Sequence, residues 1–187
     1  MSEQQNLRPG RSAPELAQAT SLGLAELLGE ALRRKGWMLG TAESCTGGLL
    51  AGAITAVAGS SEWFERGFVT YSNDAKVSEL DVSPDALHHF GAVSEPVALE
   101  MANGVLLASP AAHVAVSTTG IAGPGGATPG KPVGMVCFGF AVRAGDGISS
   151  RAVTHVFPGD RGQVRQAAVD YALRGALELL GAPVNRR

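Results

Sequence analysis

The sequence Thr41-Ala-Glu-Ser-Cys-Thr-Gly-Gly48 joins a short apolar run to a stretch of small apolar residues. Trp37-Met38-Leu39 precedes it and is typical of a strand, whereas residues 49–54 are too many and too small for another strand and predict a helix to about residue 57. We therefore expect a strand-to-helix turn with Ser44 and Cys45 at its apex. Helix N-termini leave backbone N–H groups unpaired and carry partial positive charge. The turn thus predicts a nucleophile beside an oxyanion stabiliser.

The rest of the chain divides into alternating helices and strands. Helical spacing and N-cap residues predict helices at 14–35, from 72 through 76, at 83–91, 94–107 and 160–180, and β-rich runs predict strands at 68–71, 114–119, 135–142 and 151–157. A connection rich in glycine and proline, residues 120–134, has the length typical of functional loops. The order predicts an α/β fold, a three-layer α/β/α sandwich with a mixed sheet between two layers of helices.

The chain has 187 residues, of which 45% are apolar and 17% charged, enough for one domain with a sizeable core. We expect residues 1–20 to form a mobile N-terminal tail and residues 21–182 to form a single domain. A net charge of −2 argues against a nucleic-acid-binding face. Because the chain shows no signal sequence and no apolar run of membrane-spanning length, we expect a cytoplasmic protein without membrane or nucleic-acid partners.

The cysteines and histidines predict no metal site. Cys45 and Cys137 are far apart and form no Cys-x-x-Cys motif, so neither a disulfide framework nor a zinc site is indicated. Two of the histidines are adjacent and two are isolated: His88, His89, His113 and His155. Adjacent histidines on a helix face different directions and cannot share a metal in the usual way. We expect no metal and no cofactor.

Several multi-residue blocks, in a fixed order, carry a family resemblance. They are Thr41-Ala-Glu-Ser-Cys-Thr-Gly-Gly48, Gly67-Phe-Val-Thr-Tyr-Ser-Asn-Asp-Ala-Lys76, Gly91-Ala-Val-Ser-Glu-Pro96, Thr119-Gly-Ile-Ala-Gly-Pro124 and Lys131-Pro-Val-Gly134. Together, over roughly residues 22–180, they closely resemble the CinA C-terminal-domain family, whose stand-alone members are nicotinamide mononucleotide (NMN) deamidases of the PncC type. The loop at residues 127–130 is short and carries no acidic residue, which we note as a departure that affects access to the site.

The resemblance implies hydrolysis of the NMN carboxamide to nicotinic acid mononucleotide and ammonia, in pyridine-nucleotide (NAD) salvage. It also implies an α/β/α sandwich and a homodimer. Only about 20 residues precede the matching region. We therefore expect the N-terminal domain of full-length CinA proteins, with its pyrophosphatase-type activity, to be absent.

By the same resemblance Ser44 is the nucleophile, Lys76 its base and Tyr71 the third catalytic member. Lys76 also stands in the first turn of a predicted helix, where the positive end of the dipole lowers a lysine pKa. From the residues alone, Ser44 is equally a helix N-cap, Lys76 a surface lysine and Tyr71 a strand aromatic. Cys45 is a rival nucleophile, because helix N-termini lower thiol pKa values, and with Glu43 and Lys76 it offers the residue types of nitrilase-type amidases.

The substrate-binding candidates surround these residues. Glu43 either pairs with Lys76 or holds it charged until substrate arrives. The backbone N–H groups that follow Ser44, those of Cys45, Thr46 and Gly47, are the candidates for the oxyanion site. Thr119 and Gly120 lie at the end of a predicted strand. Ligands of open α/β sheets usually bind at such strand ends, so both residues are candidate ligand contacts.

Phosphate requires cationic partners. Arg161 and Arg165 lie four residues apart on one face of the last predicted helix, near its start, and Lys131 in the glycine-rich loop is a further candidate. Asp160 is the alternative partner for Arg161.

Three other functions compete with the NMN amidase. One is a non-catalytic nucleotide-binding or interaction module, because related domains occur in proteins linked by name to competence and DNA damage. Another is the same chemistry on a different amide or lactam. DNA binding is the least favoured, because of the charge balance and the lack of a recognised motif. The presence of Ser44, Tyr71 and Lys76 favours the enzyme over the module.

Overall fold

The computed structural model describes residues 20–181 of the chain. The predicted tail, apart from Thr20, and the start of the first predicted helix at Pro14 lie outside the described residues. Five strands form one mixed sheet in the order β2-β1-β3-β4-β5: β1 (Leu39–Glu43), β2 (Phe64–Val69), β3 (Val114–Gly120), β4 (Met135–Ala144) and β5 (Gly147–Val156). β2, β1 and β3 are parallel to one another, whereas β4 and β5 are antiparallel to their neighbours. The sheet is mixed, as predicted.

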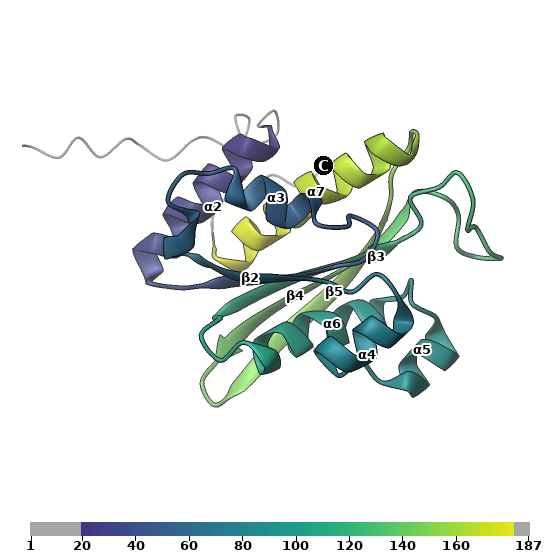
Figure 1. Ribbon diagram of the computed structural model, residues 1–187, viewed down its shortest axis with the longest axis horizontal. Coiled ribbons are helices and arrows are strands. Elements are labelled where there is room, and N and C mark those ends of the chain that lie inside the picture. The colour runs from purple at the N-terminus through teal and green to yellow at the C-terminus, as the bar shows by residue number, and fades with distance from the viewer. Residues whose placement is uncertain (1–19, 182–187) are drawn as a thin grey trace, which may run out of the picture.

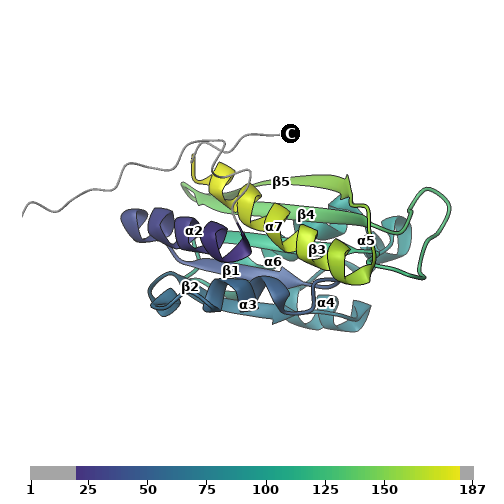
Figure 2. The same ribbon diagram turned by 90° about the horizontal axis from the view of Figure 1, so that it is seen from above.

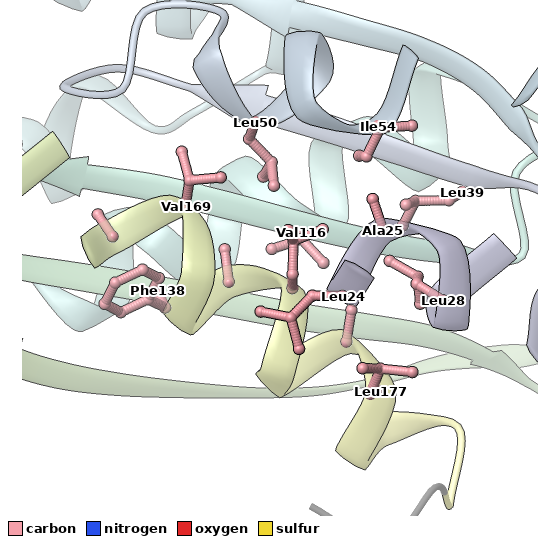
Figure 3. Packing of buried hydrophobic residues seen from close by; sticks show 14 of the residues in the cluster. Leu24, Ala25, Leu28, Leu39, Leu50, Ile54, Val116, Phe138, Val169 and Leu177 are labelled. Carbon is pink, nitrogen blue, oxygen red and sulfur yellow. The ribbon is translucent and has the colours of Figure 1, made fainter. Parts of the chain in front are cut away.

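One layer of helices covers the first face of the sheet (Figures 1 and 2). It consists of α2 (Ser21–Lys35), α3 (Leu49–Thr55) and α7 (Arg161–Leu179). Their apolar faces pack on the sheet around Leu24, Leu50, Val116, Phe138 and Val169, all of which are at most 1% exposed (Figure 3). Burial of such side chains is the main stabilising term of this layer.

The second layer lies on the opposite face (Figure 1). Helix α6 (Glu95–Ala108) packs directly on β1, β3, β4 and β5, and α4 (Asn73–Leu80) and α5 (Pro84–Phe90) pack on α6. Serine N-caps begin all three helices as predicted, at Ser72, Ser83 and Ser94. The three-layer α/β/α sandwich is therefore confirmed.

Three strand predictions were wrong in their bounds, one of them because β5 begins at Gly147, four residues before the expected start at residue 151. The strand expected at residues 37–39 is β1, which begins at Leu39 and continues to Glu43, directly before the turn. The strand expected at 68–71 is β2, which runs from Phe64 to Val69 because its pairing with β1 ends where Glu43 lies opposite Val69. Polar residues hid its first half, and an edge strand tolerates them because one side of it has no neighbour.

This topology brings the carboxyl ends of the three parallel strands together. The turn after β1 carries Ser44, the segment from β2 to α4 carries Tyr71 and Lys76, and β3 ends at Thr119 and Gly120. Ligands of open α/β sheets bind at such strand ends. The connection from β3 to β4 extends outward from the same end of the sheet (Figures 1 and 2).

Candidate active site

A pocket of about 200 Å³ opens at these strand ends. The residues that line it come from the turn after β1, the β2–α4 segment, the loop before α6, the end of β3 and the start of α7: Ser44, Cys45, Tyr71, Asn73, Lys76, Ala92, Val93, Thr119, Gly120, Ala122 and Arg161. The structure thus brings seven of the predicted site residues into one pocket. Asn73, Ala122 and the pair Ala92–Val93 were not predicted as site residues, although all four lie inside the quoted sequence blocks.

A serine and a lysine lie in direct contact in this pocket. The Nζ atom of Lys76 is 3.0 Å from Ser44 Oγ, 2.8 Å from the carbonyl oxygen of Thr70 and 3.5 Å from that of Ser72. These three oxygens are neutral acceptors, and two of them belong to the backbone. A neutral amine in this position keeps its N–H groups on the two carbonyls and turns its lone pair toward the Ser44 hydroxyl.

Burial makes the neutral form of Lys76 easier to reach. The side chain is 1% exposed, and burial lowers its pKa because the charged form loses its hydration. We expected the dipole of α4 to lower this pKa, but burial is the dominant cause. Sequence spacing cannot reveal it, since burial depends on segments distant in sequence, such as the turn that carries Ser44.

Cys45 is poorly suited to be the nucleophile. Its side chain is 6% exposed, and burial raises the pKa of the thiol to about 12. The backbone N–H groups of Cys45 and Thr46 favour the thiolate, but burial outweighs them. A thiol with this pKa is overwhelmingly protonated at neutral pH, so the helix-terminus argument for a reactive Cys45 does not hold in this fold.

Glu43 does not lie where we expected it. Its carboxylate is fully buried and accepts hydrogen bonds from the N–H groups at the start of α3, from Gly48 (2.9 Å) and Leu50 (3.0 Å) on one oxygen and from Ala51 (2.8 Å) on the other. The expected pairing with Lys76 is therefore wrong. The start of α3 is likewise no open anion site, because Glu43 already occupies it.

The hydrogen bonds of the turn identify the donors that remain. The N–H of Ser44 donates to Thr118, that of Gly47 to Ser44 and that of Leu49 to Thr46, in each case to the carbonyl oxygen. The carboxylate of Glu43 accepts hydrogen bonds from the N–H groups of Gly48, Leu50 and Ala51. Over residues 44–51, only the N–H groups of Cys45 and Thr46 donate to no oxygen atom within the described part of the chain, and their one neighbour as an acceptor is the weakly accepting Cys45 sulfur. Since buried N–H groups are nearly always paired, these two are available to a ligand oxygen.

The turn is held in place by Arg165 of α7 and by a contact between Thr46 and Thr118 of β3. The guanidinium of Arg165 donates from Nε to the carbonyl oxygen of Cys45 (3.1 Å) and from Nη2 to that of Thr46 (2.8 Å). The hydroxyl of Thr46 lies 2.7 Å from that of Thr118, and both residues are fully buried. These contacts are with the protein itself, so the two side chains support the turn, whereas we had predicted that they bind substrate.

Arg161 and Tyr71 meet at the mouth of the pocket. Arg161 donates from Nη2 to the Tyr71 hydroxyl (3.1 Å) and from Nη1 to the carbonyl oxygen of Gly123 (2.9 Å). Asp160, the alternative partner, is instead the N-cap of α7 and forms a capping box with Gln163. The ring of Tyr71 is 60% exposed, and no hydrogen bond joins its hydroxyl to Ser44 or Lys76 among the described residues.

Two further candidates serve neighbouring loops. The hydroxyl of Thr119 donates to the carbonyl oxygen of Ala92 (2.8 Å) and so fixes the loop before α6 against the end of β3. Lys131 donates to the carbonyl oxygen of Phe90 (2.5 Å) and does not line the pocket. Thr119 therefore shapes the pocket wall, whereas Lys131 has no contact with it.

The fold and the pocket define an α/β protein with a serine–lysine site at the carboxyl ends of parallel strands. The chain belongs to the family of the CinA C-terminal domain, whose sequence model matches residues 21–180. It is 54% identical over 151 residues to the nicotinamide-nucleotide amidohydrolase PncC of Escherichia coli K12, covering 81% of this chain and 89% of that protein. A CinA-like protein of Chlorobium phaeobacteroides is 50% identical, and the match covers 87% of this chain but 39% of that longer protein.

Solved structures of the family share the fold. The competence damage-inducible protein A (ComA) of Klebsiella pneumoniae superimposes with a TM-score of 0.82 at 37% identity, covering 87% of this chain and 98% of that one. The competence/damage inducible protein CihA of Agrobacterium tumefaciens gives a TM-score of 0.78 at 44% identity, covering 86% of this chain and 95% of that one.

Within residues 20–181, no group of three or more histidine, cysteine, aspartate or glutamate side chains is arranged to hold a metal. No helix in that range is long and apolar enough to cross a membrane.

Proposed function

We propose that this protein is an NMN amidase that hydrolyses the carboxamide by a serine–lysine mechanism, without a metal or other cofactor. The observation that carries the proposal is the 3.0 Å contact between Lys76 Nζ and Ser44 Oγ in a pocket where the lysine is buried. The relatives named nicotinamide-nucleotide amidohydrolase supply the substrate class. We further propose that the reaction serves NAD salvage and that the enzyme is a homodimer, which light scattering tests.

The chemistry begins with proton transfer from Ser44 to Lys76. As Ser44 Oγ bonds to the carboxamide carbon, its proton moves to Nζ, and the carbonyl oxygen becomes an oxyanion. Lys76 then gives a proton to the departing nitrogen, the C–N bond breaks and ammonia leaves. Water attacks the resulting ester with Lys76 again as base, which releases nicotinic acid mononucleotide and restores the Ser44 hydroxyl.

The oxyanion is assigned to the N–H groups of Cys45 and Thr46. They follow Ser44 directly, and among the described residues they are the two donors of the turn that lack an oxygen acceptor. Donors fixed before the reaction stabilise developing charge strongly, because they need no reorganisation in the transition state. In this scheme the oxyanion is held by two backbone amides and not by the dipole of α3, which Glu43 neutralises.

The phosphate is assigned to Arg161. This exposed guanidinium lies at the pocket mouth, and its present partners are a neutral hydroxyl and a carbonyl oxygen, both weaker acceptors than a phosphate. Tyr71 then either supports Arg161 or, as the family resemblance implies, relays a proton. Replacement of Tyr71 by phenylalanine separates these roles.

The first test is ammonia release from NMN by the wild type, with and without EDTA, compared with Ser44→Ala, Lys76→Met and Cys45→Ala. We expect turnover to collapse in the first two variants, with the loss of the general base costing about 10²–10⁴-fold, and to persist in the third. Collapse only in Cys45→Ala would move the nucleophile to the thiol. Binding of NMN without turnover by the wild type would leave a nucleotide-binding module as the better account.

A second substrate tests the phosphate assignment. Nicotinamide riboside lacks the phosphate, so Arg161→Gln should raise KM for NMN by about tenfold or more and leave turnover of the riboside unchanged. If Tyr71 only supports Arg161, Tyr71→Phe follows the same pattern. If Tyr71 relays a proton, Tyr71→Phe lowers kcat on both substrates. Equal effects of Arg161→Gln on both substrates would refute the phosphate role.

A further inference from the structure

We propose that Arg165 is a positioning residue that aims the two oxyanion-stabilising N–H groups, those of Cys45 and Thr46. The inference rests on the proposed amidase mechanism and adds a residue that touches neither substrate nor nucleophile. Its basis is the geometry of the peptide groups between Ser44 and Gly47, to which Arg165 donates two hydrogen bonds from α7.

The first bond sets the N–H of Thr46. A trans peptide group is planar, and its C=O and N–H point in opposite directions. Arg165 Nε donates to the carbonyl oxygen of Cys45, which belongs to the same peptide group as the N–H of Thr46. That N–H must therefore point away from the guanidinium. The positive charge on the carbonyl side also polarises the peptide and strengthens its N–H as a donor.

The second bond sets the N–H of Cys45 through one intermediate. Arg165 Nη2 donates to the carbonyl oxygen of Thr46, so the N–H of Gly47, in the same peptide group, points the other way. It donates to the carbonyl oxygen of Ser44 (3.1 Å). The carbonyl oxygen of Ser44 therefore points toward Gly47. Because it shares a peptide group with the N–H of Cys45, that N–H points away from Gly47. One guanidinium thus fixes all three peptide groups.

Glycine at position 47 allows this arrangement. Its φ is +57°, in the left-handed region, and a Cβ there would lie 3.3 Å from Arg165 Nη2. A side chain at this position would strain the turn and crowd the guanidinium. Lysine cannot replace Arg165 either, because a single ammonium lacks the planar fork that reaches two carbonyls at once.

The chain offers a matched control in Arg143, near the end of β4. Its guanidinium also binds backbone carbonyls, donating to Ala112 (2.8 Å), Ser109 (3.4 Å) and Leu106. These lie around the carboxyl end of α6 and the start of β3, at the opposite end of the sheet from the pocket. Arg143→Met and Arg165→Met therefore remove the same kind of contact, and only Arg165→Met disturbs the turn.

The experiment measures kcat and KM for NMN per folded enzyme, with the folded fraction taken from circular dichroism. We expect Arg165→Met and Arg165→Lys to lower kcat roughly 10- to 100-fold, below the ~10²–10³-fold that follows loss of an oxyanion donor in a serine protease. KM should stay within about threefold, and the ascending limb of the pH profile should not move, because Lys76 is untouched. Arg143→Met should lose stability and keep kcat.

A substrate-independent measurement separates this proposal from the amidase itself. A fluorophosphonate probe forms an Ser44 Oγ–P bond, releases fluoride and passes the serine proton to Lys76, and its phosphoryl oxygen uses the same two donors. We expect Arg165→Met to slow this labelling, read by intact mass with Ser44→Ala as the blank, by a factor similar to that for kcat. Wild type that labels but does not hydrolyse NMN would sink the substrate claim alone.

Four results would overturn the role of Arg165. A raised KM with unchanged kcat would make it a substrate-binding residue. Equal kcat losses in Arg143→Met and Arg165→Met would make it merely structural. Full activity of Arg165→Lys would mean that charge, and not the two-carbonyl geometry, is what matters. Failure of the wild type to label would remove the activated serine and this proposal with it.

Discussion

Replacement of Glu43 by glutamine tests how the end of β1 stabilises the start of α3 across the turn that carries Ser44. The carboxylate is fully buried at the end of β1 and accepts three hydrogen bonds from the first N–H groups of α3. Glutamine has nearly the same shape, but only one of its two polar ends accepts hydrogen bonds. In its better orientation it keeps the bonds from Gly48 and Leu50 and turns its NH₂ toward the N–H of Ala51.

The contacts give the magnitude. One buried donor left without an acceptor costs about 1–3 kcal/mol, and each of the two retained bonds loses about 1 kcal/mol when the acceptor becomes neutral. Relief of carboxylate desolvation offsets part of this sum. We therefore expect Glu43→Gln to lower the free energy of unfolding by about 2–4 kcal/mol, and a domain of this size then loses about 4–16 °C in Tm.

Urea and thermal denaturation followed by circular dichroism measure this change. The control is Glu30→Gln on the exposed face of α2, which makes the same chemical change and should shift stability by less than about 0.5 kcal/mol. A Glu43→Gln variant as stable as the control would refute the reasoning, because it would mean that the three hydrogen bonds contribute nothing to the folded state.

Three further predictions concern the lysine, the thiol and the packing of α4 on α6. Because burial lowers the pKa of Lys76 and the neutral amine is the base in the proposed mechanism, kcat/KM should rise with pH along a limb below the ordinary lysine range, measured by ammonia release. Because Cys45 is buried with its pKa raised to about 12, iodoacetamide should not modify it in the native protein, as read by mass spectrometry. A Cβ on Gly104 would lie 2.1 Å from the carbonyl oxygen of Leu80, so Gly104→Ala should destabilise by about 1–3 kcal/mol in urea, whereas Gly52→Ala, with open space around it, should be neutral or stabilising.

Each of these predictions has an outcome that would contradict it. A kcat/KM that falls as pH rises toward the ordinary lysine range would mean that charged Lys76 is the active form. Rapid native modification of Cys45 would show that the turn opens readily. Equal stability of the two glycine variants would show that α4 and α6 can separate without cost.

Much of the fold could be predicted because local chemistry and periodicity agreed with the tertiary structure. The N-caps at Ser72, Ser83 and Ser94 each appear as a serine two or three residues before an apolar helical pattern, and all three helices begin there. The predictions failed for strand bounds, which depend on pairing with the neighbouring strand. β2 is an edge strand whose length is set by its register with β1, and no local pattern encodes that register.

The contact between Ser44 and Lys76 was anticipated through the family resemblance, but the partners of the other polar residues were not. Glu43 and Arg165 were predicted to face substrate, and both instead bind the backbone of the turn between β1 and α3. Sequence assigns a charge to a position and not a direction to its side chain. A carboxylate or a guanidinium near a turn has the backbone as a competing partner, and only the packed structure decides between backbone and ligand.

The separate partners of Glu43 and Lys76 are consistent with the proposed role of the buried lysine as a base. An opposite charge nearby favours the ammonium and raises the lysine pKa, which would leave little free amine at neutral pH. Three N–H groups at the start of α3 hold the Glu43 carboxylate, while within residues 20–181 the hydrogen-bond acceptors of Lys76 Nζ are a hydroxyl and two carbonyl oxygens. If this account holds, Glu43→Gln lowers stability without moving the ascending pH limb of kcat/KM. A shift of that limb to lower pH would instead reveal an ion pair with Lys76 in the working enzyme, because removing a carboxylate partner lowers the pH at which the lysine loses its proton.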